Sequence, residues 1–158
     1  MEKLNVQILN KEHLAYAGVC SYCESFGKIR YDSNNRISEG EYVSHLCDYI
    51  IYSQLPGNEI LAYAGIVVSG TDFYIKQVAF HQIMVISENE EPFLSNIIEQ
   101  AISGGFSRII VDVPEDDLIS QILFSDLGFK PTLNIEGKGI VLVFHVLHYQ
   151  QPYQYKLN

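Results

Sequence analysis

PFLSNIIEQAISGGFSRIIVDVPEDDLISQILFSDLGF, residues 92–129, contains a helix, a strand and a second helix, and this stretch decides the fold. Apolar residues recur at helical spacing from Phe93 to Ile102, and the pair Gly104-Gly105 ends the first helix. Arg108–Val113 is a short apolar run, typical of a strand in a sheet that is covered on both faces. The second helix ends at Gly128, and one side of it is predicted to consist of Leu118, Ile119, Ile122, Leu123 and Leu127. Helices that flank a buried strand predict a sheet with helices packed on it.

Strand patterns surround this stretch. Residues 49–52, 60–68 and 73–86 are separated by turn signals and predict three antiparallel strands, while residues 132–135 and 140–148 predict a closing hairpin. The chain opens with a strand over residues 5–9 and a helix from residue 11 to about residue 27, and a capping-box pattern at residues 38–41 predicts a second short helix to about residue 47. The predicted order is β-α-α-β-β-β-α-β-α-β-β. This is an α/β (mixed α+β) fold with a mostly antiparallel sheet and helices on both faces.

The length of 158 residues predicts one domain. Residues 1–47 would form its N-terminal strand and two helices, residues 48–148 the sheet core, and residues 149–158 a tail rich in Gln and Tyr. With 47% hydrophobic and 18% charged residues the composition is that of a folded globular protein. The longest uncharged stretches are shorter than the ~20 apolar residues of a membrane span, and no secretory signal is visible. We therefore expect a cytoplasmic protein.

The formal net charge of −9 restricts the partners. It argues against binding to nucleic acid and to anionic membranes, because both repel an acidic protein. Expected partners are a cationic small-molecule amine or a basic protein surface. The tyrosines of the tail are typical either of a contact surface or of a strand end that pairs within the sheet. A homodimer is a further expectation.

The cysteines do not predict a metal site. Cys20 and Cys23, together with Cys47 and either His13 or His45, could in principle supply four zinc ligands. However, the single C-x-x-C pair lies inside a helical pattern and a second pair is missing. We interpret the three cysteines as thiols.

One motif resembles a known family. Asp117-x-x-Ser120-x-x-x-Phe124-x-x-x-Gly128-Phe129 resembles the Asn-x-x-Ala-x-x-x-Tyr-x-x-x-Gly-Phe signature of the GNAT superfamily of acyl-CoA N-acyltransferases. The resemblance is strongest over residues 48–144, and the earlier residues agree in element order only. It implies transfer of an acetyl group from acetyl-CoA to an amine.

The resemblance also implies site residues. The pantetheine arm of the cofactor would pair with strand backbone at Met84, Val85 and Ile86, and Asp117 would lie among the cofactor-binding residues. If Val85 matches the family's valine, the usual catalytic glutamate is replaced by Ala79. His81, two residues further on, is then the nearest substitute base.

Two further features depart from the family. Phe124 stands at the position of the tyrosine acid and has no proton to give. The phosphate-binding loop, Gln/Arg-x-x-Gly-x-Gly/Ala in the family, corresponds to residues 87–95, which contain no glycine and three glutamates. From residue 77 to residue 129 Arg108 is the only basic residue, so an anionic coenzyme would meet repulsion there.

Two functional hypotheses follow. The first is a divergent N-acyltransferase that acts on a cationic amine. The alternative is a catalytically inactive, protein-binding or regulatory module of the same fold, similar to the antizymes of ornithine decarboxylase, which does not bind acetyl-CoA. Transfer from an acyl carrier protein is a third hypothesis and requires a basic patch. A basic, open cleft between the fourth strand (residues 73–86) and the fifth (residues 108–113) would favour the enzyme, and a closed or acidic cleft the binding module.

Overall fold

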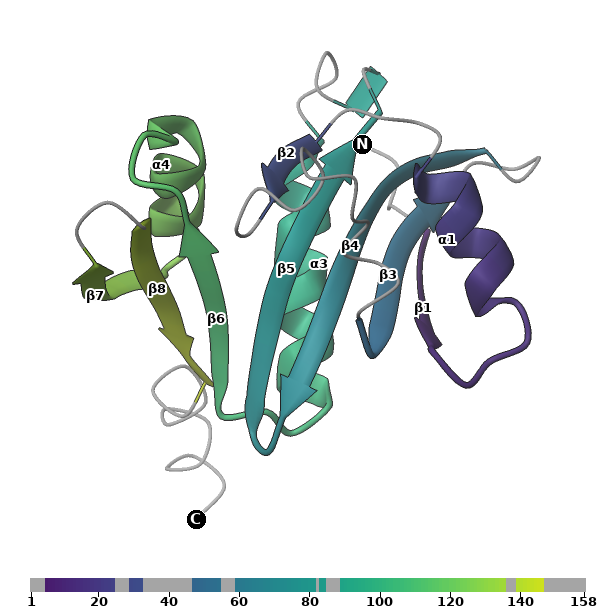
Figure 1. The fold of residues 1–158 in the computed structure, drawn as a ribbon, viewed down its shortest axis with the longest axis horizontal. Coiled ribbons are helices and arrows are strands. Elements are labelled where there is room, and N and C mark those ends of the chain that lie inside the picture. The colour runs from purple at the N-terminus through teal and green to yellow at the C-terminus, as the bar shows by residue number, and fades with distance from the viewer. Residues whose placement is uncertain are drawn as a thin grey trace, which may run out of the picture.

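The computed structural model describes residues 5–24, 29–32, 47–54, 59–81, 83–84, 89–135 and 139–146. Within these residues one sheet has the strand order β1-β3-β4-β5-β6-β8-β7, and β2 is paired to β5 outside this path (Figure 1). The strands are β1 (Val6–Asn10), β2 (Ile29–Asp32), β3 (Tyr49–Gln54), β4 (Ile60–Ser69), β5 (Asp72–Phe80), β6 (Arg108–Val113), β7 (Lys130–Ile135) and β8 (Gly139–His145). The helices are α1 (Tyr16–Glu24), α3 (Glu90–Ser103) and α4 (Leu118–Asp126). β5 and β6 run parallel and the other pairs antiparallel, which confirms the predicted mixed sheet.

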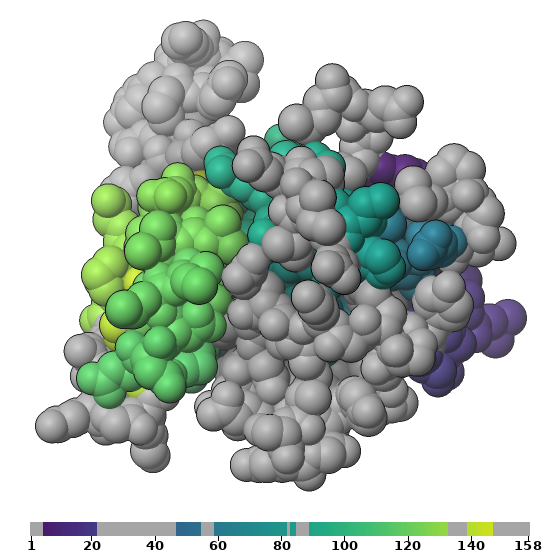
Figure 2. Space-filling view, turned by 90° about the horizontal axis from the view of Figure 1, so that it is seen from above, coloured from purple at the N-terminus to yellow at the C-terminus, as the bar shows by residue number. Residues whose placement is uncertain are grey.

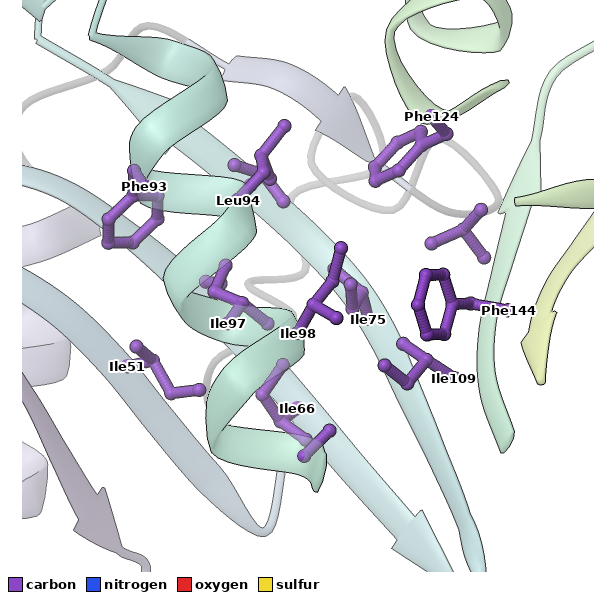
Figure 3. Packing of buried hydrophobic residues seen from close by; sticks show 14 of the residues in the cluster. Ile51, Ile66, Ile75, Phe93, Leu94, Ile97, Ile98, Ile109, Phe124 and Phe144 are labelled. Atoms are coloured by element: carbon purple, nitrogen blue, oxygen red, sulfur yellow. The ribbon is translucent and has the colours of Figure 1, made fainter. Parts of the chain in front are cut away.

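Apolar residues on the two faces of the sheet build two cores. On β3, Ile51 belongs to the larger cluster, which includes residues of α3 and α4, whereas Ile50 and Tyr52 belong to the cluster that includes α1. Adjacent strand residues point to opposite faces, so one strand serves both cores. Figure 3 shows α3 lying across the strands, with Phe93, Leu94 and Ile97 directed into the larger cluster. The helical spacing predicted this buried face of α3.

The predicted strand over residues 73–86 is wrong at its end, because β5 stops at Phe80. The backbone N–H of His81 still donates to the carbonyl of Leu61 at 2.7 Å, but the N–H of Met84 then donates back to the carbonyl of His81 at 2.9 Å and the chain turns. Met84 is 1% exposed and belongs to the larger core cluster. Its apolar character reflects burial in a helical segment, residues 83–84, and the sequence alone does not separate this from burial in a strand.

Helix α4 presents a different side to the core than its apolar pattern predicted. Leu118, Ile119 and Ile122 are 64%, 64% and 62% exposed, while Ser120 and Phe124 are buried. The Phe124 ring packs edge-on against Phe129, with 5.3 Å between the centroids. Burying this aromatic ring in the existing core sets the rotation of the helix, and the three aliphatic side chains consequently face outward.

Two predictions cannot be compared with the structure. The second short helix, expected to end near residue 47, and the tail over residues 149–158 lie outside the described residues. Strand β2, by contrast, was not predicted. The described helices include none that is long and apolar enough to cross a membrane.

Asp48 connects β1 and β4 and makes the stability depend on pH. Its carboxylate accepts from the N–H of Val68 at 2.8 Å and from Lys11 Nζ at 2.9 Å, and these two contacts lower the pKa of Asp48. A lowered pKa in the folded state stabilises the protein above the unfolded value of about 3.9, and this contribution is lost as the pH falls through the folded pKa. We expect the free energy of unfolding to fall from pH 5 to pH 2.5, and to fall less in Asp48→Asn. Urea titrations at both pH values measure this, and an equal decrease in the two proteins would contradict it.

Candidate functional site

The candidate site is the region in which β5 and β6 separate. The two strands pair in parallel from Asp72 opposite Arg108 to Ile75 opposite Val111. Beyond these residues they diverge toward their carboxyl ends (Figure 1). We call the region between residues 76–80 of β5 and the end of β6 the fork. In open α/β sheets, ligands bind at the carboxyl ends of neighbouring strands, so the fork is where a ligand is expected.

Strand β2 occupies the edge of β5 that faces the fork. One edge of β5 is paired with β4 along its whole length, from Asp72 opposite Ser69 to Phe80 opposite Ala62. A strand has only two edges, so β2, which pairs antiparallel with Gln77–Ala79, lies on the edge that β6 leaves. Figure 1 shows β2 beside the upper end of β5, on the side of β6. The backbone groups that an open fork would offer to a ligand are therefore used by the chain itself.

A buried polar pair lies on β4 and β5 at the level of β2. The hydroxyl of Tyr63 donates to Gln77 Oε1 at 2.9 Å, and Gln77 is 0% exposed. Gln77 Nε2 is buried and has no hydrogen-bond partner among the described residues. In the backbone register, Gln77 lies opposite Asp32 of β2. A buried amide N–H group ordinarily donates a hydrogen bond, and the acceptor can be neutral or anionic. Neither β2 nor this pair was predicted; a Gln within an otherwise apolar strand was the available signal.

His81, the predicted base, follows β5 directly and is 39% exposed at its side chain. Its Nδ1 accepts a hydrogen bond from the N–H of Ile83 at 3.2 Å. The other ring nitrogen, Nε2, is 3.9 Å from Glu59 Oε1. The backbone thus engages the lone pair of Nδ1, and the role of His81 as a base stays a prediction.

The backbone predicted to hold the pantetheine arm is not strand. The N–H of Met84 donates to the carbonyl of His81, and its carbonyl accepts from the N–H of Asn89 at 3.0 Å. Both backbone groups of Met84 are engaged, since β5 has ended four residues earlier. Val85 and Ile86 lie outside the described residues.

Asp117 and Phe124, the two motif positions, have structural roles. Asp117 caps α4, with Oδ1 accepting from the N–H of Ser120 at 3.1 Å and Oδ2 accepting from its hydroxyl at 2.7 Å. The carboxylate therefore lies at the helix N-terminus, the place where a phosphate group would otherwise bind. Phe124 is 1% exposed and packs in the core. The alignment of the motif with a helix and its end is confirmed, but neither side chain is arranged for proton transfer.

Carboxylates outnumber cations around the fork, which also contains Lys76 on β5 and Arg30 on β2. Glu90 and Glu91 lie in the first turn of α3, and Glu115 and Asp116 are exposed in the turn after β6. Arg108 lies at the opposite end of β6 and makes two bonds to Asp72, at 2.8 Å and 2.6 Å. A paired guanidinium at the far end of the strand cannot neutralise phosphates at the fork. Most of the charged residues that the structure describes there are carboxylates, which disfavour an anionic acyl-CoA, and Ser87 and Glu88 of the corresponding loop lie outside the described residues.

The cysteines that were weighed as zinc ligands are packed in the smaller core. Cys20 and Cys47 are 1% and 3% exposed, and the hydroxyl of Tyr16 donates to the carbonyl of Cys47 at 3.1 Å. Burial raises the pKa of Tyr16, which keeps its proton for this bond. No group of three His, Cys, Asp or Glu side chains that could hold a metal ion occurs in the described part of the chain. The side chains of Cys23 and His45 are outside it.

Comparison with known proteins adds the fold family. No protein-family model and no curated protein matches the sequence. Solved structures do match. The ribosomal-protein-S18-alanine N-acetyltransferase of Escherichia coli is 12% identical, with a TM-score of 0.61 over 90% of this chain and 94% of that chain. An N-acetyltransferase of Staphylococcus aureus is 10% identical, with a TM-score of 0.61 over 90% and 99% of the two chains.

A third match carries the family name. It is a Desulfovibrio desulfuricans protein assigned to the GNAT acetyltransferases, 10% identical, with a TM-score of 0.63 over 90% of this chain and 99% of that chain. At these identities the likeness concerns the fold, and it extends over nearly the whole length of each neighbour. The strand order and the parallel β5–β6 pair agree with the resemblance seen in the motif. The chain therefore has the fold of the GNAT superfamily of acyl-CoA N-acyltransferases.

Proposed function

We propose that this chain is a GNAT-fold protein that acts by binding a partner protein and does not take acetyl-CoA into the fork. The observation that carries the proposal is the pairing of β2 with Gln77–Ala79 on the edge that β6 leaves. A donor that pairs with this edge has to displace the backbone hydrogen bonds between β2 and β5. Each backbone hydrogen bond contributes on the order of 0.5–1.5 kcal/mol, which the donor's own bonds would have to exceed.

The chemistry of the described side chains supports the same proposal. Direct acyl transfer needs a positioned donor and acceptor, with help from a base and an acid. The lone pair of His81 is engaged by the N–H of Ile83, and Phe124 carries no exchangeable proton. Positioning is opposed as well, because Glu90 and Glu91 lie in the first turn of α3, next to the loop that would hold the phosphates.

The partner is expected to be basic. A net charge of −9 speeds the encounter with a cationic surface and disfavours acidic ones. The exposed carboxylates of Glu115 and Asp116 in the turn after β6 contribute to this field.

A second candidate function is N-acyl transfer to a cationic amine. The fold of the solved N-acetyltransferases favours it, and the carboxylates at the fork would suit a positively charged acceptor. This function requires that β2 leave β5 and that His81 exchange its bond to Ile83 for one to the amine.

Titration with acetyl-CoA separates the two functions. Calorimetry is performed on the wild type, on Tyr31→Pro, which removes a backbone N–H from β2, and on the matched control Tyr31→Ala, which keeps it. We expect no binding of acetyl-CoA at about 1 mM by the wild type or by Tyr31→Ala, because β2 keeps its pairing with β5 in both. Circular dichroism confirms that each variant is folded.

One result would contradict the proposal. Micromolar binding by the wild type would show that the fork accepts the coenzyme, and release of free thiol from acetyl-CoA in the presence of a polyamine would then establish the enzyme. Binding by Tyr31→Pro but not by Tyr31→Ala would support the proposal, because it would show that the pairing of β2 keeps the coenzyme out of the native fork. Melting at saturating ligand gives an independent reading, because ligand at 100 times its Kd stabilises a protein by about 2.7 kcal/mol.

A further inference from the structure

Helix α4 carries an apolar surface that the fold does not use. Leu118, Ile119 and Ile122 are 64%, 64% and 62% exposed. Successive helical residues are about 100° apart, so these three side chains share one side of the helix. Figure 2 shows α4 and the turn before it, in green, as a continuous area of the surface. We call these three residues the α4 stripe.

The stripe is held in a fixed orientation by groups on the other side of α4. Phe124 is 1% exposed in the core, and Asp117 caps the helix through both the N–H and the hydroxyl of Ser120. Gln121 Nε2 donates to the carbonyls of Pro114 and Glu115, at 3.1 Å and 3.0 Å, and fixes the turn that leads into the helix. The apolar side chains therefore stand on a rigid support. Exposed apolar surface bordered by polar residues is typical of interaction sites.

Acidic residues border the stripe at both ends. Glu115 and Asp116 are exposed immediately before the helix, and Asp126 is exposed at its last residue. Asp126 follows Ile122 by four positions and so lies on the same side of the helix. The surface is thus an aliphatic strip between two negative ends.

We propose that the α4 stripe and these acidic ends bind an amphipathic basic segment of another protein. Its aliphatic or aromatic side chains would cover Ile119 and Ile122, and its Lys or Arg residues would face Glu115, Asp116 and Asp126. This inference rests on the proposed function and names the surface and the class of partner. The mode is that of an amphipathic helix binding to an apolar surface, with charge setting specificity.

The negative charges beside the α4 stripe argue against a second copy of the chain, anionic lipid or nucleic acid as its partner. In a symmetric dimer built on antiparallel α4 helices, Asp126 of one copy would approach Glu115 and Asp116 of the other, and like charges would oppose the contact. Anionic lipid and nucleic acid meet the same repulsion. A basic protein segment is the occupant that satisfies both the apolar and the charged part of the surface.

A synthetic peptide with leucines on one helical face and lysines on the other is the probe. Its affinity is measured by fluorescence anisotropy for the full chain, for the double variant Ile119→Ser/Ile122→Ser, and for Leu14→Ser. Leu14 is 101% exposed and lies before α1, so its replacement is the matched control. We expect Kd to rise at least about tenfold in the double variant, because two buried contacts are lost, and to stay unchanged in Leu14→Ser. Amide NMR shifts should be confined to residues 115–126.

Three outcomes would overturn the inference. Equal affinity of the double variant would show that the peptide binds through general charge, and absence of binding would show that the stripe binds no such segment. Self-association in sedimentation that disappears in the double variant would assign the surface to a homodimer. Failure here is distinguishable from failure of the proposed function, because that is tested by acetyl-CoA binding to a fork that these substitutions do not touch.

Discussion

Phe93→Ala is expected to lower the free energy of unfolding by about 3–5 kcal/mol. Phe93 is 0% exposed on α3, and its ring meets Phe80 of β5 edge-on, with 5.9 Å between the centroids. Removing the ring deletes the contact between the helix and the strand that borders the fork, and leaves a cavity in the larger core (Figure 3). A domain of this size has a total stability of about 5–15 kcal/mol, so a large fraction would be lost.

Urea unfolding followed by far-UV circular dichroism measures the effect of Phe93→Ala. Phe93→Leu is the matched control, because it keeps most of the apolar volume and should cost clearly less. A loss of less than about 1 kcal/mol in Phe93→Ala would mean that the core collapses around the missing ring. In that case the close packing described for α3 would be wrong.

Gly139→Ala is expected to destabilise the protein by about 2–6 kcal/mol, the sum of about 1–3 for a strained backbone and about 1–3 for overpacking. Gly139 begins β8 with φ of +140°, a conformation that L side chains rarely adopt. A Cβ built there would lie 2.5 Å from the carbonyl oxygen of Val113. Because this neighbour is backbone of β6, relief requires a shift of the strand that borders the fork.

Gly70→Ala separates the two causes of the Gly139 effect. Gly70 also has a positive φ, +60°, but an added Cβ would meet nothing within 4 Å. The control should therefore cost only about 1–2 kcal/mol, for the backbone conformation alone. Urea unfolding of both variants gives the comparison. Equal costs would show that β6 yields easily and that the close approach of Gly139 to Val113 has no structural weight.

The elements predicted best are those whose apolar residues follow one clear pattern. β6 has the predicted bounds, Arg108–Val113, and α3 buries the residues that its helical spacing indicated. The prediction was wrong where a short apolar run was compatible with both strand and helix. The run over residues 83–86 resembled strand, although Met84 is buried in a helical segment.

The candidate site was predicted less well than the fold. His81 lies near the fork as expected, but its bond to Ile83 depends on a turn that replaced the predicted strand. Asp117 and Phe124 occupy the predicted ends of the motif, and both serve the packing and capping of α4. The carboxylates of residues 88–91 and 115–117 were readable from the sequence alone, whereas the pairing that brings β2 and its Arg30 to the fork was not.

By itself the sequence determined the mixed sheet, the two faces of its core and the negative charge at the carboxyl ends of its central strands, since each follows from residue type and local period. Only the tertiary structure decided the partner of β2 and the rotation of α4. Segments far apart in the chain compete for a free strand edge and for space in the core. This competition determines where a short strand pairs and which side of a helix is buried. β2 pairs with the one edge of β5 that β6 leaves. Burial of Phe124 in the core leaves the α4 stripe exposed to solvent.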